Sequence, residues 1–301
     1  LEEATQFISK GIDTSADSVF YLSEEEIASH DLEHDITKPL LKGEDINRYT
    51  PPSTNRRILF PYDGNRALSE KELQENYPNA WEYLKQNQDQ LKSRTYLVDS
   101  GYNWYEFWRK REEKLYTNPK ILSPEIAKEN EFTLDRGPNN HYFNTKVRSI
   151  KISDEFELSQ LELLGILNSS VVEHIYRGIS PPKRGGYRSY LTGFLNDIEI
   201  PTIVPEQLEG LVDKTLSDRK SLSSLNRDFY DYIAHSDPST GLTEVGLRQP
   251  VGTDKQAVLQ QSSKERPNLR VGTARVDRES PNTVLIEATA RYKPDDEDAH
   301  E

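Results

Sequence analysis

Hydrophobic residues are spaced in two ways along this chain, and short segments of each kind follow one another. Alternating or continuous apolar runs bounded by Pro, Gly and polar residues are typical of strands. On this basis strands are predicted at residues 18–22, 56–62, 120–122, 131–134 and 146–152. Spacings of three and four residues predict helices at 69–94 with a break at Tyr77-Pro78, at 159–167 and at 206–233. The mixture predicts an α+β fold.

Helix starts are marked by serines that precede glutamates. Ser69 with Glu72 and Ser159 with Glu162 have the spacing of a capping box, in which each side chain accepts a hydrogen bond from the other residue's backbone N–H. Ser23 precedes a run of glutamates, whose charge is favourable near the positive end of a helix dipole. We therefore expect a helix to begin at each of these three serines.

Composition changes along the chain and divides it. Pro201 and Pro205 close the region of mixed strands and helices. Residues 236–266 are rich in Ser, Thr, Pro, Gly and Gln, which is typical of a linker. Alternating apolar segments around Ser280-Pro281-Asn282 indicate a β-hairpin. We predict four parts: a mixed domain at 1–204, a helical spacer at 205–235, a linker at 236–265, and a small β-hairpin with an acidic tail at 266–301.

The chain is strongly acidic. It has 51 Asp and Glu against 38 Lys and Arg, a formal net charge of −13 and a sequence pI of about 5.1. Excess carboxylates keep a surface hydrated and self-repelling at high salt, so we expect a halophilic origin. The same charge argues against general affinity for nucleic acid, because phosphates are neutralised by Lys and Arg. Any contact with nucleic acid must therefore come from a local basic face.

Cysteine is missing from the sequence, which excludes disulfides, thiolate metal sites and a cysteine nucleophile. No stretch reaches the roughly 20 apolar residues of a transmembrane helix. The first residues also lack the charged-then-apolar pattern of a secretion signal. We expect a cytoplasmic protein that does not contact a membrane.

The loop at 177–190 is the main candidate for binding chemistry. It contains four cations, two tyrosines and no acid: Arg177, Lys183, Arg184, Arg188, Tyr187 and Tyr190. Its glycines permit positive φ and close approach of the backbone to a ligand. Arginine can fork onto guanine, lysine can neutralise phosphate, and tyrosine can stack on a base or contact a phosphate. The alternative is a solvated loop whose cations pair with surface carboxylates.

A second stretch, at 102–120, mixes aromatic and basic residues. Trp104, Tyr105 and Trp108 have helical spacing, which favours a place in the core over a platform for base stacking. Arg109 and Arg111 are able to face a DNA backbone, but the glutamates before and after them offer ordinary helix ion pairs: Glu106, Glu112 and Glu113. We interpret this stretch as core.

Two catalytic patterns are present only in part. Asp99 with Glu112 and Lys114 has the spacing of a metal-dependent nuclease, but the Glu and Lys follow a helical pattern rather than the strand that such a site needs. Residues 180–183 begin like an amino-methyltransferase signature, yet Lys183 takes the place of the aromatic residue that stacks on a flipped base. We expect no catalytic residue in this chain.

Metal and cofactor motifs are also missing. His30 and His34 lie four residues apart in an acidic segment, and we interpret them as surface residues rather than metal ligands. No glycine-rich strand-to-helix turn is present to hold S-adenosylmethionine. We expect no metal and no cofactor in this chain itself.

Several segments, in their order and spacing, resemble the TaqI-like C-terminal specificity domain of adenine-specific DNA methyltransferases and type IIG restriction-modification enzymes. LKGEDINRY (41–49) and LLGILNS (163–169) carry the resemblance best. The other segments are GIDTSADSVFYL (11–22), RILFPY (57–62), YPNAWEYLKQNQDQLKSR (77–94), PKILSP (119–124), and residues 104–109, 132–134 and 190–201. Together they span residues 8–204, so the last part of the chain lies outside the resemblance.

The resemblance implies a target-recognition domain that reads a short sequence in double-stranded DNA. A separate N-terminal domain of the same protein would then methylate adenine N6 with S-adenosylmethionine as its cofactor. That protein would also need Mg²⁺ if it cleaves DNA. The helix at 206–233 would correspond to the spacer helix that follows such domains, and self-association through it is a further expectation.

On this hypothesis the basic loop enters a groove of the duplex. Arg184 and Arg188 would read bases, and Arg177 and Lys183 would bind phosphate. Weaker candidates for the DNA backbone are Lys42, Arg48, Arg56 and Arg57. Two other functions remain open from the sequence: a fragment of a metal-dependent DNA endonuclease, and a protein-interaction module of a restriction-modification complex.

Overall fold

The computed structural model describes residues 1–236 except 118, 139 and 202, together with the strands at 269–280 and 283–292. Side chains are described as far as residue 223. The chain divides into two compact units, Leu1–Lys220 and Ser221–Glu301. All of the candidate site residues lie in the first unit.

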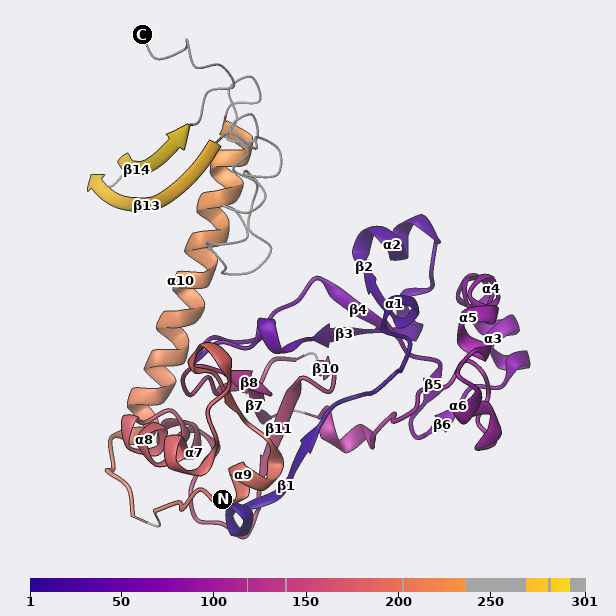
Figure 1. The fold of residues 1–301 in the computed structure, drawn as a ribbon, viewed down its shortest axis with the longest axis horizontal. Coiled ribbons are helices and arrows are strands. Elements are labelled where there is room, and N and C mark those ends of the chain that lie inside the picture. Colours follow the sequence, from indigo (N-terminus) through magenta and orange to yellow (C-terminus); the bar gives the residue numbers. More distant parts are fainter. Residues whose placement is uncertain (118, 139, 202, 237–268, 281–282, 293–301) are drawn as a thin grey trace. The chain divides into compact units, whose positions relative to one another are not determined.

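Two four-stranded sheets form the centre of the first unit (Figure 1). The first sheet has the order β1–β11–β7–β9, and all of its neighbours are antiparallel. Its strands are β1 Thr5–Lys10, β11 Val147–Ile152, β7 Lys120–Pro124 and β9 Thr133–Asp135. The second sheet has the order β10–β3–β4–β2, in which only the β10–β3 pair is parallel. Its strands are β10 Tyr142–Phe143, β3 Thr37–Leu41, β4 Arg56–Leu59 and β2 Tyr21–Ser23.

Short ribbons and helices surround these sheets. Two ribbons pair β5 Tyr62–Asp63 with β6 Arg66–Ala67, and β8 Ile126–Ala127 with β12 Arg188–Ser189. The helices are α1 Asp17–Phe20, α2 Glu24–Ser29, α3 Glu70–Asn76, α4 Pro78–Gln86, α5 Gln88–Lys92, α6 Thr95–Asp99, α7 Gln160–Leu167, α8 Ser170–Ile179, α9 Thr192–Asn196 and α10 Leu208–Ser236. Single 3-10 turns are η1 Glu2–Ala4, η2 His34–Ile36, η3 Gly43–Asp45, η4 Glu113–Leu115 and η5 Arg184–Gly186. No helix in the described residues is long and apolar enough to cross a membrane.

The first unit has two hydrophobic cores. One lies under the second sheet and is rich in aromatic rings, among which Phe20 and Phe107 meet edge to face at 4.8 Å and Tyr116 stacks on Tyr142 at 4.2 Å. The other joins the first sheet to α7, α8 and α9. Two residues from the start of α10, Val212 and Leu216, are also buried there. The first part of α10 is therefore packed onto the second core.

The three predicted helix starts are confirmed. Ser23, Ser69 and Ser159 each accept a hydrogen bond from the N–H of the third helical residue, and that residue's glutamate accepts one in return. The strands predicted at 120–122, 131–134 and 146–152 correspond to β7, β9 and β11. These elements are confirmed because their apolar pattern or their cap is local in sequence.

The strand predicted at 18–22 is wrong over most of its length. Residues 17–20 form α1, and only the last part of the segment belongs to β2. The Thr14 hydroxyl accepts a hydrogen bond from the Ala16 N–H and donates to Asp17 Oδ1 at 2.5 Å. This local network turns the chain before the apolar residues begin, so Val19 and Phe20 are buried from a helical turn.

The core interpretation of the stretch at 102–120 is confirmed, but its helical spacing is not. Trp104 and Tyr105 are buried, whereas Trp108 is only half-buried. Apart from η4, the described residues of this stretch before β7 form turns and extended chain. Aromatic spacing predicted the burial of Trp104 and Tyr105 correctly, and it predicted the backbone conformation wrongly.

A helix and a two-stranded ribbon follow the mixed domain. α10 begins two residues later than the helix predicted at 206–233, and β13 Leu269–Ser280 pairs with β14 Thr283–Tyr292 in antiparallel register. The role of α10 as a spacer stays a prediction. The predicted linker after residue 236 and the acidic tail lie outside the described residues. The division at residue 204 stays a prediction.

Candidate nucleic-acid interface

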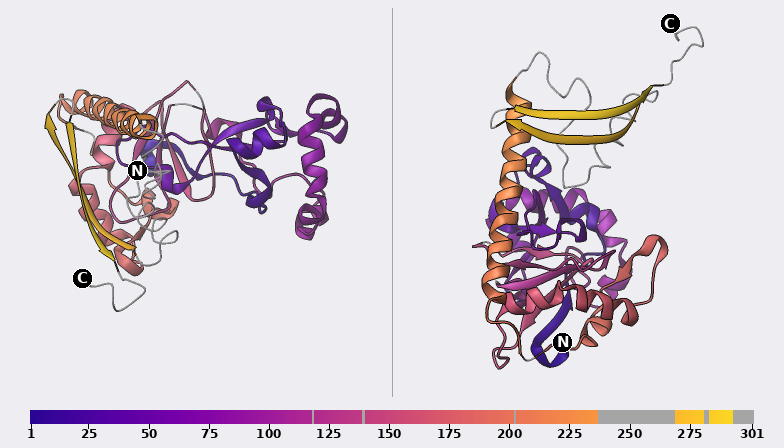
Figure 2. Two further views of the ribbon diagram at one scale, coloured as in Figure 1. Left: turned by 90° about the horizontal axis from the view of Figure 1, so that it is seen from above. Right: turned by 90° about the vertical axis from the view of Figure 1, so that its left-hand side faces the viewer.

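The basic loop at 177–190 begins in the last turn of α8, passes through η5 and ends in β12. In Figure 2 (right) the salmon segment between α8 and α9 projects from the elements around it. Its returning end is held by β8, since Arg188 pairs with Ala127 and Ser189 with Ile126. A two-stranded ribbon thus carries the loop at its end.

The tip of the loop is a tight backbone turn. The Lys183 N–H donates to the Tyr187 carbonyl at 2.8 Å, and the Gly186 N–H donates to the Lys183 carbonyl at 3.2 Å. Gly185 and Gly186 adopt φ of 78° and 80°, a left-handed conformation that glycine takes without steric cost. The paired glycines therefore set the shape of the tip.

The base of the loop is closed by hydroxyl groups. The Tyr176 OH and the Ser180 Oγ both donate to the Ser189 carbonyl, at 2.7 and 3.0 Å. The Ser189 N–H donates back to Ser180 Oγ at 3.2 Å. Since all three residues are buried, these bonds fasten the end of α8 to β12 away from solvent.

Arg188 is half-buried and is bonded to the base of the loop. Its Nη1 donates to the Arg177 carbonyl at 2.7 Å and to the Ser180 carbonyl. Arg177 belongs to the last turn of α8, where carbonyls have no partner within the helix. Arg188 therefore supports the loop through Nη1, and its role as a base reader stays a prediction.

Tyr190 is likewise a support. It is 2% exposed, its ring stacks on Tyr176 at 4.7 Å, and its OH donates to Asn130 Oδ1 at 3.0 Å. Burial raises the pKa of the Tyr190 phenol, which keeps the hydroxyl protonated as a donor. A ring held in this way cannot stack on a nucleic-acid base, so Tyr190 is removed from the contact surface.

Four side chains remain at the outer surface of the ribbon, which we call the tip cluster: Lys128, Lys183, Arg184 and Tyr187. Lys183 and Arg184 are exposed, and neither has a side-chain partner among the described residues. Tyr187 is 40% exposed, and Lys128 Nζ lies 5.1 Å from the centre of its ring. Arg177 is exposed beside the cluster but pairs with Glu173 at 2.6 Å.

Lys128 was missed by the sequence analysis. It follows β8, and it reaches Tyr187 only because β8 pairs with β12. A two-residue strand leaves no periodic signal in the sequence, and its partner lies about 60 positions further along the chain. Only the tertiary pairing brings this lysine to the loop.

The weaker arginine candidates of the second sheet are engaged elsewhere. Arg56 binds Asp45 at 2.6 Å and Glu44 at 2.9 Å. Arg57 donates from Nε to Thr37 Oγ1 at 2.6 Å and from Nη2 to the Thr37 carbonyl at 3.0 Å. Burial lowers the pKa of Arg57, as expected for a guanidinium partly removed from water. Both arginines link elements of the fold.

The other two weaker candidates also contact the fold. Lys42 is half-buried, with Nζ 5.5 Å from the ring centre of Tyr21. Arg48 stacks on Tyr49 and donates to the Asn168 carbonyl. Asn168 in turn exchanges two hydrogen bonds with the Phe132 backbone, at 2.9 and 3.1 Å. The segments LKGEDINRY and LLGILNS therefore meet through Arg48 and Asn168.

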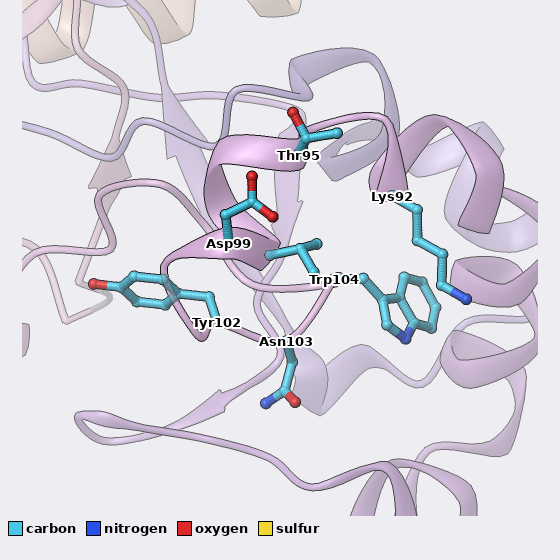
Figure 3. Close-up of a pocket in the computed structure, with 7 residues that line it drawn as sticks. Lys92, Thr95, Asp99, Tyr102, Asn103 and Trp104 are labelled. Carbon is cyan, nitrogen blue, oxygen red and sulfur yellow. The ribbon is translucent and has the colours of Figure 1, made fainter.

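The nuclease pattern is not assembled into a site. Glu112 pairs with Lys114 at 2.7 Å on the surface, beside η4 rather than on a strand. Asp99 is in the last turn of α6 and lines a cavity of about 420 Å³ to which neither residue contributes (Figure 3). Within the described part of the chain, no three His, Asp or Glu residues are grouped so as to hold a metal ion. The nuclease alternative gains no support.

Comparison with known proteins agrees with this arrangement. A family model described as the TaqI-like C-terminal specificity domain matches residues 38–200, more than half of the chain. The match contains both sheets apart from β1 and β2, and the whole basic loop. It ends before α10.

Two curated relatives are methyltransferases. The Type II methyltransferase M.BanIII of Aneurinibacillus aneurinilyticus is 29% identical over 126 residues, which cover 40% of this chain and 22% of the relative. The Type II methyltransferase M.BstVI of Geobacillus stearothermophilus is 22% identical over 229 residues, covering 73% of this chain and 38% of the relative. The chain therefore matches well under half the length of each relative.

A solved structure shares the fold. The Type IIL restriction-modification enzyme MmeI, in complex with DNA, superposes with a TM-score of 0.50 at 15% sequence identity, over 85% of this chain and 31% of that chain. This likeness confirms the mixed α and β architecture. With the family model matching more than half of its length, the chain belongs to the family of TaqI-like C-terminal specificity domains.

Proposed function

We propose that this chain reads a short sequence in double-stranded DNA, as the specificity part of a restriction-modification N6-adenine methyltransferase. Membership of the specificity-domain family and the Type II methyltransferases among the relatives support this function. The observation that carries it is the tip cluster, where unpaired cations and an exposed tyrosine sit at the end of a projecting ribbon. Such a ribbon fits the width of a major groove.

Each residue of the cluster has a role that its chemistry suits. Arg184 reads a base, because its guanidinium can donate two parallel hydrogen bonds to guanine O6 and N7. Lys183 and Lys128 bind phosphate as point charges, and Tyr187 contacts a sugar or a thymine methyl with its ring. Arg177 can bind phosphate only after its ion pair with Glu173 breaks, so its role is secondary.

Within the described residues, the turn between β1 and α1 does not fit S-adenosylmethionine. A cofactor turn needs a glycine whose open side faces the ligand between a strand and a helix. Gly11 lies between β1 and α1, but a Cβ placed on it would meet the Phe143 carbonyl oxygen at 1.9 Å. Its open side is therefore filled by the protein's own backbone. We propose that methyl transfer belongs to a separate domain of the same protein, and that the protein acts in the cytoplasm.

The function can be tested by selecting binding sites from a library of randomised DNA duplexes with the full chain. Recognition of a short sequence should enrich one motif over successive rounds. The charge-matched variants Lys183→Ala/Arg184→Ala and Lys85→Ala/Arg219→Ala each remove two cations, the second pair from exposed positions on α4 and α10. The first variant should lose the enrichment and the second should keep it. Uniform recovery of sequences by the unmodified chain would show that it does not read DNA.

A further inference from the structure

The exposed Arg109 lies against the half-buried Trp108 and forms a second cationic surface, outside the basic loop. The Arg109 guanidinium lies 4.7 Å from the centre of the Trp108 ring, and Tyr96 meets the same ring edge to face at 5.0 Å. Arg109 is exposed and Tyr96 is 45% exposed. We call these three residues the tryptophan patch.

The backbone under this patch is fixed. The Arg109 N–H donates to the Asp13 carbonyl at 2.9 Å, and the Asp13 N–H donates to the Arg109 carbonyl at 3.0 Å. Two residues later Arg111 has a positive φ of 75°, and its Nε donates to the Gly11 carbonyl at 3.2 Å. The arginine side chain is therefore presented from a rigid strand-like bridge rather than from a free loop.

The acidic residues near Arg109 in sequence, and Asp13 across the backbone bridge, have other partners. Asp13 accepts from the Ser15 N–H at 3.1 Å, and Glu106 accepts from the Asn103 N–H at 2.7 Å. Glu112 pairs with Lys114 at 2.7 Å. The Arg109 guanidinium has no carboxylate or carbonyl partner among the described residues, although the chain is acidic overall. A guanidinium that stacks by its face keeps its N–H donors free at the edge.

The surroundings of the patch are amphipathic. α6 carries Tyr96 toward Trp108, while Val98 and Tyr102, which are 44% and 42% exposed, line the cavity of about 420 Å³. Figure 3 shows Lys92 extending beside the Trp104 ring at this cavity, and Lys92 Nζ lies 6.0 Å from the ring centre. Cations that alternate with partly exposed aromatic side chains match the alternation of phosphate and sugar along a nucleic-acid strand.

We propose that the tryptophan patch is a second DNA contact, which grips the sugar–phosphate backbone without reading sequence. Arg109 donates to a phosphate, and Tyr96 packs against the adjoining sugar. The contact rests on the proposed function, because it needs the same duplex to be bound. This contact raises the affinity for DNA and orients the chain on the duplex, whereas the tip cluster discriminates between DNA sequences.

The test compares variants of the full chain in binding a random-sequence DNA duplex at several salt concentrations. Arg109→Ala should weaken binding about three- to tenfold and make the slope of log affinity against log salt shallower by about one. Arg109→Lys keeps the charge but loses the planar fork, and should recover the slope and part of the affinity. Arg219→Ala is the matched control, since it removes an exposed arginine from α10 and should change neither quantity.

The possible results separate this inference from the proposed function. If Arg109→Ala binds the duplex as the unmodified chain does, the patch serves another partner, such as a carboxylate-bearing protein surface, and the inference is overturned. Equal losses in Arg109→Ala and Arg219→Ala would overturn it too, because they would reflect net charge alone. Failure of the unmodified chain to bind any duplex would remove both proposals. Melting temperatures of the variants, which should be unchanged, confirm that each is folded.

Discussion

At the scale of single residues, the sequence identified where cations gather but not which of them are free. Arg184 and Arg188 have the same chemistry and lie four positions apart, yet the first is exposed and the second is bonded to two carbonyls. The difference arises because β12 pairs with β8 and turns Arg188 toward the end of α8. Composition cannot show this, since carbonyl partners leave no mark in the sequence.

Substitution of Arg188 should therefore lower the stability of the fold, whatever its effect on sequence recognition. We expect Arg188→Ala to lower the free energy of unfolding by about 1–3 kcal/mol, because it leaves carbonyls at the end of α8 without their donor. Urea unfolding measures this change. Arg184→Ala, which removes an exposed guanidinium, should stay within about 0.5 kcal/mol of the unmodified chain. Equal effects of the two substitutions would contradict the assigned orientations.

Tyr142 provides a residue-scale test of burial through pH. Burial raises its pKa to about 12, and its ring stacks on Tyr116. An unfolded tyrosine titrates near pH 10, so the folded chain binds more protons than the unfolded chain between about pH 10 and 12. The stability contributed by neutral Tyr142 should be complete below pH 10 and fall as the pH rises through that window.

The measurement is the free energy of unfolding at pH 9 and at pH 11.5. The unmodified chain should lose stability between them, and Tyr142→Phe should lose about 1–2 kcal/mol less, since a phenyl ring cannot ionise. A Tyr142→Phe profile that runs parallel to that of the unmodified chain would exclude the raised pKa.

At the scale of elements, local signals predicted well and tertiary pairings did not. The three serine–glutamate caps and the strands β7, β9 and β11 were predicted, because their cap or apolar pattern lies within the segment itself. The β8–β12 ribbon was not, since each strand has two residues and their pairing is set by the fold. This ribbon presents the tip cluster, so the sequence located the loop but not its supports or Lys128.

The packing of α10 onto α7 depends on one glycine. A Cβ on Gly165 would lie 2.8 Å from Val212 Cγ2 and 2.9 Å from Leu208 Cδ1, both on α10. Alanine normally favours a helix over glycine by about 1 kcal/mol, but here the clash opposes that gain. Gly165→Ala should therefore destabilise the chain by about 1–3 kcal/mol.

Gly178 in α8 is the matched control, because nothing lies within 4 Å of a Cβ placed there. Gly178→Ala should leave stability unchanged or raise it slightly. Thermal unfolding of both variants measures this difference in stability. A Gly165→Ala chain as stable as Gly178→Ala would mean that α10 does not pack closely on α7.

Self-association through α10 is a separate prediction, which light scattering of the full chain tests.

At the scale of the whole molecule, the placement of the charges reconciles the acidity of the chain with the proposed recognition of DNA. The chain has a net charge of −13, while the tip cluster contains no acid, and Asp13, Glu106 and Glu112 have partners other than the Arg109 guanidinium. Self-repulsion of the remaining carboxylates opposes folding, and salt screens it: the Debye length falls from about 10 Å at 0.1 M to about 3 Å at 1 M. We propose that the chain is adapted to concentrated salt.

That adaptation predicts a rise in melting temperature between about 0.1 and 2 M KCl, with the two-state shape of the transition retained. The neutral osmolyte sucrose at equal osmolality is the control, since it does not screen charge. A melting temperature that is flat or falls with KCl would contradict a stability limited by carboxylate repulsion.

The central claim is that free cations at the tip of one ribbon read DNA sequence. It is tested most directly by the ratio of affinities for a selected duplex and its scrambled counterpart, measured for Lys183→Ala/Arg184→Ala beside Lys85→Ala/Arg219→Ala. We expect the tip variant to bring this ratio close to one, and the control to keep the ratio of the unmodified chain even where both bind more weakly. If the tip variant keeps its discrimination, or the control loses it equally, the basic loop does not read the sequence.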